Sequence, residues 1–116
     1  MNMSTSIQIT TTDADSTRAL GARLATLLRA GDLVMLSGGL GAGKTTLAQG
    51  IGSALDVRGR VSSPTFIIAR VHPAKGSGPD LIQVDAYRLN SLDEVDALDL
   101  ESSMEEGITL VEWGQD

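Results

Sequence analysis

Residues 38–45 read Gly-Gly-Leu-Gly-Ala-Gly-Lys-Thr and match the phosphate-loop pattern G-x-x-x-x-G-K-[ST], the feature that most constrains the fold of this chain. In such a loop the glycines let several backbone N–H groups turn toward one phosphate chain. The lysine adds a positive charge, and the hydroxyl helps to hold Mg²⁺. A strand must precede the loop and a helix must follow it, because the helix N-terminus contributes further N–H groups and the positive end of its dipole. The motif therefore predicts a nucleotide-binding strand–loop–helix unit.

The residues on both sides of the loop fit this context. Leu33–Ser37 is apolar enough to be a buried strand. Thr45–Leu55 is expected to form the helix, because leucine and isoleucine recur every four residues along it. A glycine-rich turn that binds nothing is the alternative, and the matching flanks count against it.

Helical and strand patterns continue on both sides of this unit. A first helix is expected over Asp13–Arg29, capped by Asp13 or Thr12. Two strands, Phe66–Val71 and Leu81–Asp85, flank a loop that contains two prolines and two glycines. We expect these strands to form a hairpin.

The last part of the chain predicts an acidic helix and a final strand. Ser91 is expected to cap the helix, with Glu94 in the capping-box position, and Gly107 follows its end. Ile108–Glu112 is expected to be the strand. Because helix and strand alternate around a phosphate loop, we predict an α/β, P-loop NTPase-like three-layer fold with a central mixed, mostly parallel sheet. Residues 1–116 are expected to form a single ATP-binding domain.

Charge is unevenly distributed along the chain, whose formal net charge is −6. Residues 1–90 contain nine basic and six acidic side chains, whereas residues 91–116 contain nine acidic and no basic ones. This distribution argues against a broad nucleic-acid face, so no direct DNA binding is expected. The acidic run at residues 93–101 is typical of a solvated helix face, with a docking surface for a basic partner as the alternative.

The sequence also indicates a compartment. Cysteine is absent, which fits a reducing environment. The first residues lack the pattern of a signal peptide, and no apolar run approaches the roughly 18 residues that cross a bilayer. We expect a cytoplasmic protein that does not contact a membrane.

Candidate catalytic groups stand where the predicted strands end. Lys44 is expected to reach the β- and γ-phosphates, and Thr45 to bind Mg²⁺. Asp85 and Glu112 each end an apolar strand, at the edge where ligands of parallel sheets bind. Phosphoryl transfer needs a carboxylate that orients the metal ion or its waters. The residues alone leave open which of the two carboxylates is the direct ligand.

Four other residues are less informative. Thr65 stands where a switch loop senses a γ-phosphate, although a proline-rigidified strand entry explains the same spacing. Arg88 is expected at the surface, with pairing to a carboxylate or a phosphate as the alternative. Trp113 is expected at an edge of the fold, with a role at the site as the alternative. His72, in the expected loop, is assigned no role.

Four sequence blocks, in this order, resemble the TsaE (YjeE) family, the bacterial ATPases of the tRNA threonylcarbamoyladenosine pathway. The blocks are Leu40–Thr46, Ser63–Phe66, Asp85–Leu89 and Leu110–Trp113. The first block alone is generic, whereas the other three together are specific to the family.

The resemblance implies an ATPase that binds ATP with Mg²⁺, hydrolyses it slowly by itself and supports the TsaB–TsaD complex. That complex attaches a threonylcarbamoyl group to the adenosine next to the anticodon of tRNAs that read codons starting with A, so this chain would meet tRNA only indirectly. By motif match, Thr45 and Glu112 would bind Mg²⁺, Asp85 would be a catalytic-site carboxylate and Thr65 a switch residue. Lys44 would act in catalysis. The residues that would hold the phosphates are Leu40, Gly41, Ala42, Gly43, Lys44, Thr45 and Thr46.

The chain departs from the family pattern at two positions. Gln83 stands where the family usually has histidine, and glutamine does not titrate near neutral pH. Gly39 stands where an acidic residue is common. The family also continues beyond the Leu110–Trp113 block with further strands, so we expect a C-terminally truncated chain.

Two alternative functions remain open at this point. A small nucleotide or metabolite kinase shares the strand, loop and helix, but it needs lid arginines, and residues 91–116 contain none. A non-catalytic nucleotide switch would bind ATP and recruit a partner without needing hydrolysis. A GTPase is disfavoured because the chain has no Asn-Lys-x-Asp motif.

Overall fold

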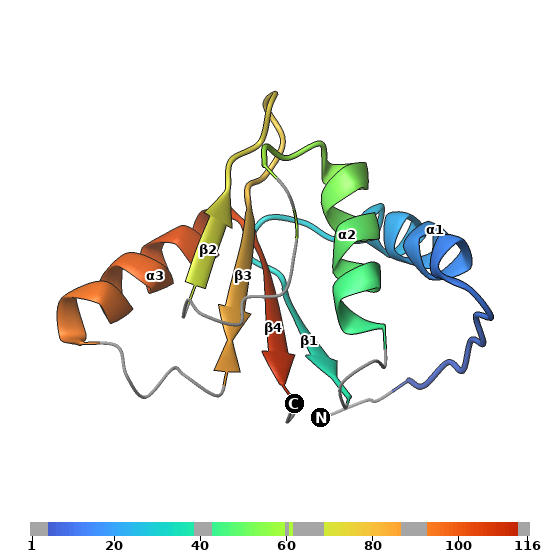
Figure 1. Cartoon of the computed structure of the whole chain (residues 1–116). Helices are drawn as coiled ribbons and strands as arrows, with labels where there is room; N and C mark the ends of the chain where they lie inside the picture. Colours follow the sequence, from blue (N-terminus) through green and yellow to red (C-terminus); the bar gives the residue numbers. More distant parts are fainter. Residues whose placement is uncertain (1–4, 39–42, 60, 62–68, 87–92, 114–116) are drawn as a thin grey trace.

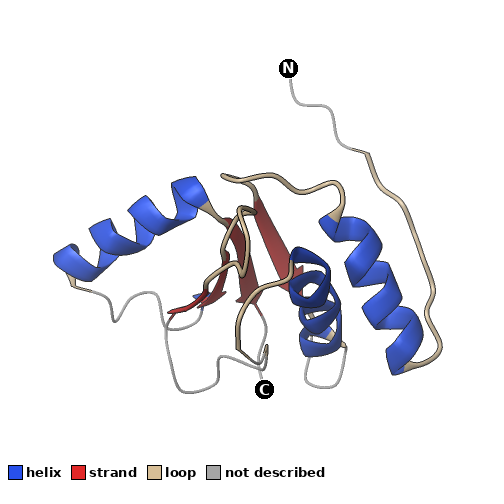
Figure 2. Cartoon of the chain, turned by 90° about the horizontal axis from the view of Figure 1, so that it is seen from above, coloured by secondary structure: helices blue, strands red, loops and turns tan. Residues whose placement is uncertain are grey.

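The computed structural model describes residues 5–38, 43–59, 61, 69–86 and 93–113. These residues form a four-stranded sheet with helices on both of its faces (Figures 1 and 2). The elements, in chain order, are α1 (Ala14–Ala25), β1 (Leu33–Ser37), α2 (Lys44–Leu55), β2 (Ala69–His72), β3 (Leu81–Asp85), α3 (Glu94–Glu106) and β4 (Ile108–Trp113). The predicted three-layer α/β arrangement is confirmed.

The sheet has the strand order β1-β4-β3-β2. Strand β4 is parallel to both of its neighbours, and β2 joins antiparallel to β3, so the predicted mixed sheet and its hairpin are confirmed. The bounds of β1 and β3 are those predicted. Strand β2 begins at Ala69, and residues 66–68 of the predicted strand lie outside the described residues.

Two apolar clusters hold the layers together. The larger one packs α2 against the sheet, with Ile51 of α2 and Leu81, Ile108 and Leu110 of the strands fully buried. The smaller one lies on the opposite face, where Leu100 of α3 packs against three buried side chains. These are Ile82, Val84 and Val111. Because strand side chains alternate between faces, Gln83 and Asp85 share the α2 face with Leu81.

Helices α1 and α2 approach each other so closely that glycine is required where they cross. A Cβ added to Gly50 would lie within 3.0 Å of the backbone of Arg18, and one added to Gly21 would lie as close to the carbonyl oxygen of Leu47. Such contacts are closer than real Cβ atoms come, so only glycine allows this crossing. The crossing holds the start of α1 beside the start of α2.

Helix α1 begins as predicted and ends earlier than predicted. Asp13 caps it by accepting a hydrogen bond from the backbone N–H of Ser16 at 2.7 Å. Hydrogen bonds from the hydroxyl and the N–H of Ser16 lower the pKa of Asp13, so the cap is charged at neutral pH. The helix stops at Ala25 because the hydroxyl of Thr26 bonds the carbonyl of Arg23 at 2.7 Å and the following amides bond only three residues back.

Helix α3 has a different cap from the one predicted. Asp93 accepts a hydrogen bond from the N–H of Asp96 at 2.8 Å and serves as the N-cap. Ser91, the predicted cap, lies outside the described residues. The end of the helix at Glu106, followed by Gly107, is confirmed.

Strand β1 is buried on only one face, so the predicted buried strand is buried only in part. Leu36 is 6% exposed beneath α2, whereas Leu33 is 51% and Met35 58% exposed on the opposite face. The reason is that α3 packs on β3 and β4, and no described residue covers this face of β1. No helix in the described part of the chain combines the length and the apolar character needed to span a bilayer.

Candidate functional site

The carboxyl ends of three strands meet at one edge of the sheet, as predicted. In the register of β3 and β4, Asp85 stands directly beside Glu112. On the other side of β4, Glu112 stands beside Leu36, two residues before the phosphate loop. The N–H of Gly38 donates to the carbonyl of Trp113 at 3.3 Å and continues this contact past the end of β1. Glu112 therefore lies next to the strand that enters the loop, and Asp85 lies one strand further away.

The two ends of the phosphate loop are described, while residues 39–42 are not. Gly43 is the N-cap of α2 with φ of +95°, a backbone conformation that favours glycine. Among the described residues, no side chain caps this helix, and its first turn carries no acidic residue. The first backbone N–H groups of α2 are therefore available to an anion, and no carboxylate in that turn would repel it.

Lys44 spans the turn between the two ends of the loop. Its Nζ donates a hydrogen bond to the carbonyl oxygen of Gly38 at 2.7 Å. The ammonium group is thus held between the end of β1 and the first turn of α2, where a phosphate bound to the helix N-terminus would meet it. Phosphate oxygens would compete for the same donor, since charge-assisted hydrogen bonds to phosphate are stronger than those to a neutral carbonyl.

The structure places six of the predicted site residues at this edge. They are Gly43, Lys44, Thr45, Thr46, Asp85 and Glu112. Thr45 and Asp85 are partly buried, and Glu112 is buried with 9% of its surface exposed. The other predicted site residues, Leu40, Gly41, Ala42 and Thr65, lie outside the described residues.

The donor set at this edge fits Mg²⁺ only when a nucleotide shares the ion. Within the described part of the chain, no three His, Asp or Glu side chains gather into a site that could hold a metal by themselves. Mg²⁺ usually keeps several waters and takes one or two protein oxygens together with substrate phosphates. The hydroxyl of Thr45 and the carboxylate of Glu112 can supply those two protein oxygens.

The start of α1 lies beside the phosphate loop. The position of a Cβ on Gly43 would be 3.8 Å from Cγ2 of Thr17. The hydroxyl of Thr17 is in turn 2.7 Å from the hydroxyl of Thr11, in the segment before the helix. The methyl group of Thr17 therefore stands next to the C-terminal end of the loop, and its hydroxyl links it to the segment before α1.

His72 and Gln83 form a buried polar pair that the sequence interpretation missed. His72 belongs to β2 and is 3% exposed; its Nε2 lies 2.7 Å from Oε1 of Gln83, itself 1% exposed. The Nδ1 atom of His72 lies 3.3 Å from the carbonyl oxygen of Arg58. The expectation that His72 is a loop residue without a partner was wrong. Extending the predicted hairpin by one residue pair, His72 with Leu81, would have placed His72 and Gln83 on the same face of the sheet, the one that α2 covers.

Comparisons with known proteins agree with this geometry. The family model described as threonylcarbamoyl adenosine biosynthesis protein TsaE matches residues 11–116. A Streptomyces coelicolor protein named tRNA threonylcarbamoyladenosine biosynthesis protein TsaE is 65% identical over 99 residues, which cover 84% of this chain and 67% of that protein. A Mycobacterium tuberculosis protein of the same name is 50% identical over 108 residues, which cover 87% of this chain and 64% of that protein. The chain thus spans about two thirds of the length of these relatives.

A solved structure shares the fold. The crystal structure of Bacillus subtilis YdiB superposes with a TM-score of 0.66 at 31% sequence identity. The match covers 89% of this chain and 61% of that one. The arrangement of strands and helices around the loop is therefore that of a P-loop NTPase fold.

Proposed function

The chain belongs to the TsaE family of tRNA threonylcarbamoyladenosine biosynthesis proteins, and from this premise we propose that it binds ATP with Mg²⁺ and hydrolyses it in support of the TsaB–TsaD complex. One observation carries the proposal. The phosphate-loop lysine, the uncapped start of α2 and two strand-end carboxylates occupy one edge of the sheet. Phosphoryl-transfer sites combine these same parts.

Each residue has a distinct task in the proposed reaction. The backbone N–H groups at the start of α2 bind the phosphates, and the ammonium of Lys44 moves from the carbonyl of Gly38 to the β- and γ-phosphate oxygens. The hydroxyl of Thr45 and the carboxylate of Glu112 would hold Mg²⁺, which would neutralise charge on the phosphates. Asp85, one strand away, accepts a hydrogen bond from the attacking water and orients it. Thr65 is proposed as the residue that senses the γ-phosphate.

The decisive experiment measures ATP hydrolysis by the chain with and without the purified TsaB–TsaD complex. We expect slow hydrolysis by the chain alone and strong stimulation by the complex. No stimulation would contradict the partner assignment and leave an ATP-binding domain. Transfer of labelled phosphate to a small-molecule acceptor would instead favour a kinase.

Nucleotide binding is tested separately by Lys44→Ala. Loss of a hydrogen-bonded charge on the phosphates is expected to weaken ATP binding about 10- to 100-fold, as measured by isothermal titration calorimetry with Mg²⁺ present. The matched control is Lys75→Ala, which removes the chain's other lysine, a half-exposed residue that pairs with Asp56 at 3.6 Å. The control is expected to bind ATP like the unaltered chain. Equal affinity of the Lys44→Ala variant would contradict the proposed site.

A further inference from the structure

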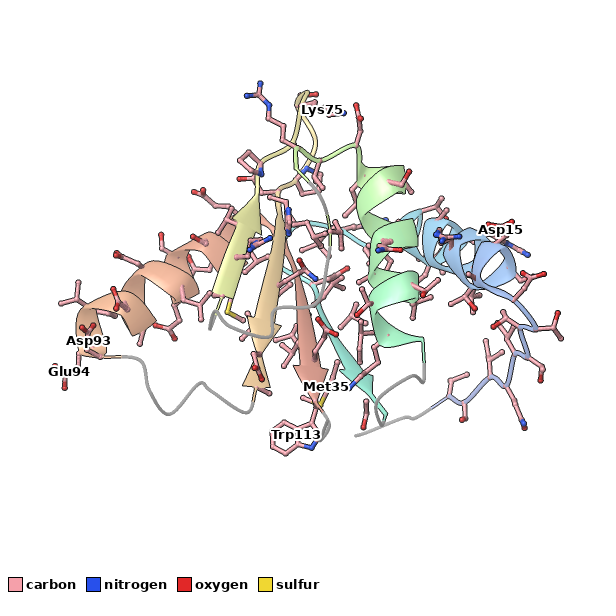
Figure 3. The ribbon with its side chains drawn as sticks, viewed as in Figure 1. Asp15, Met35, Lys75, Asp93, Glu94 and Trp113 are labelled. Atoms are coloured by element: carbon pink, nitrogen blue, oxygen red, sulfur yellow. The ribbon has the colours of Figure 1, made fainter. Side chains whose placement is uncertain are left out.

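Helix α1 lies against the helix that leaves the phosphate loop, as Figures 1 and 3 show. Asp15, labelled in Figure 3, marks the first turn of α1. Further along, Gly21 approaches the carbonyl oxygen of Leu47 so closely that no side chain fits between the two helices. Backbone atoms cannot rotate aside as side chains do, so α1 has a fixed position relative to the first turns of α2.

Thr17 of α1 faces Gly43, the residue at which the phosphate loop joins α2. Thr17 lies one turn before Gly21, and Gly43 lies one turn before Leu47, so the contact between the helices continues as far as the loop. Cγ2 of Thr17 is 3.8 Å from the position of a Cβ on Gly43, which is an ordinary van der Waals distance. The methyl group of Thr17 therefore faces the side of Gly43 from which any other residue would project its side chain.

The hydroxyl group of Thr17 keeps the methyl group in this place. Its Oγ1 donates to the carbonyl oxygen of Asp13 at 3.1 Å and lies 2.7 Å from the hydroxyl oxygen of Thr11. A threonine in a helix divides between two χ1 rotamers, because its hydroxyl can bond a carbonyl three or four residues earlier. These hydrogen bonds select one rotamer, the one in which Cγ2 points to Gly43.

Gly43 needs such support because its backbone is free to change. It is the N-cap of α2 with φ of +95°, and glycine populates positive and negative φ about equally. The peptide groups on either side of Gly43 carry the first N–H groups that the helix offers to a phosphate. A change of φ at Gly43 would turn these groups away, so neighbouring atoms have to hold the conformation.

We propose that Thr17 is a positioning residue for phosphate binding, whose methyl group holds Gly43 in the conformation that directs the first N–H groups of α2 at the phosphates. The proposal rests on the proposed function in one respect, which is that the phosphates bind at the start of α2. Thr17 acts through Gly43 and touches neither the base nor the sugar of the nucleotide. A loop end that is held in place before the nucleotide arrives costs less free energy to order on binding.

Two substitutions separate the methyl group of Thr17 from its hydroxyl group. Thr17→Ser removes the methyl group and is expected to weaken ATP binding about fivefold, because Gly43 then holds the required conformation only about a fifth of the time. Thr17→Val keeps a methyl group towards Gly43, and the carbonyl of Asp13 still accepts from the backbone N–H of residue 17 at 3.1 Å. The affinity of the valine variant is expected to stay within about twofold of that of the unaltered chain.

The matched control is Thr10→Ser, which removes an exposed methyl group from the segment before α1. This variant is expected to bind ATP like the unaltered chain. Urea unfolding checks that every variant is folded at the temperature of the titrations.

Calorimetric titrations with Mg²⁺ present use two probes, ATP and sodium tripolyphosphate, which carries phosphates without a base or a sugar. Thr17→Ser is expected to weaken the binding of both probes by the same factor, because the loss lies at the phosphates. The rate of hydrolysis at saturating ATP is expected to stay unchanged, since the variant weakens binding of the ground state and of the transition state equally.

The outcomes separate the inference from the proposed function. If Thr17→Ser binds both probes as tightly as the unaltered chain, even with a less stable fold, Thr17 is only structural and the inference is wrong, while the ATP site stands. A loss with ATP but not with tripolyphosphate, or a loss in Thr17→Val but not in Thr17→Ser, would give Thr17 a direct contact with the nucleotide and overturn the inference. If the unaltered chain binds neither probe, the proposed function and the inference are both wrong.

Discussion

Replacing Glu112 by Gln is expected to reduce stimulated ATP hydrolysis by at least about 100-fold while changing ATP affinity less than about threefold. The side chain is buried with 9% exposed, and the amide keeps its size and can still accept a hydrogen bond. It lacks the negative charge that, in the proposed function, would hold Mg²⁺ and its waters in position. The start of α2 and Lys44 would still hold the phosphates, so ATP binding is expected to survive. Steady-state hydrolysis with TsaB–TsaD and calorimetric titration with ATP measure the two quantities.

Two further variants serve as the control and the comparison for Glu112→Gln. Asp15→Asn removes an exposed carboxylate that pairs with Arg18 at 2.9 Å and is expected to leave hydrolysis unchanged. Asp85→Asn is expected to lower hydrolysis without raising the Mg²⁺ concentration required, whereas Glu112→Gln raises it. If Asp85→Asn, and not Glu112→Gln, raised the required Mg²⁺ concentration, Asp85 would be the Mg²⁺ ligand and Glu112 the residue that orients the water. Full tRNA modification by the Glu112→Gln variant would favour a nucleotide switch that does not need hydrolysis.

Replacing Gly50 by Ala is expected to destabilise the fold by about 3 kcal/mol or more, a large part of the stability of a small domain. Alanine normally strengthens a helix interior relative to glycine by about 0.5–1 kcal/mol. Here the added Cβ would lie 2.8 Å from the Cα of Arg18 and closer still to its carbonyl oxygen. Backbone cannot rotate out of the way as a side chain does, so α1 and α2 must separate and lose their apolar contacts. Urea unfolding followed by circular dichroism measures the loss.

The control for this variant is Gly76→Ala in the loop between β2 and β3. No heavy atom lies within 4 Å of a Cβ placed there, so the substitution adds no clash. Its stability is expected to equal or slightly exceed that of the unaltered chain, because alanine restricts the unfolded state. A Gly50→Ala variant as stable as this control would show that the two helices do not cross as closely as described.

Local sequence patterns predicted most of the sheet. Leu33–Ser37 and Leu81–Asp85 are strands with the predicted bounds, because short apolar runs between polar turns have few other ways to bury themselves. The meeting of Asp85 and Glu112 followed from the rule that parallel strands end at the same edge. The roles given to these two residues and to Lys44, Thr45 and Thr65 stay predictions.

Patterns that depend on a distant partner were predicted less well. Helix α1 ends four residues earlier than predicted because the hydroxyl of Thr26 bonds the carbonyl of Arg23. The sequence alone does not show whether a threonine continues a helix or bonds the backbone in this way. His72 was placed in a loop because its partner, Gln83, is eleven residues away and reaches it only across the hairpin. A single position gives no sign of such a pair.

The sequence by itself determined the fold class and the edge of the sheet at which the candidate site residues meet. The phosphate loop needs a strand before it and a helix after it, and acidic residues that end strands come to the same edge in any parallel sheet. Only the tertiary structure decided what each element faces. It showed that α1 crosses α2 at Gly21 and Gly50 and that, among the described residues, β1 is covered on one face only. The physical reason is that backbone preferences and hydrophobic periodicity act within a few residues of the chain. Which face of an element is covered depends instead on how all the elements pack against one another.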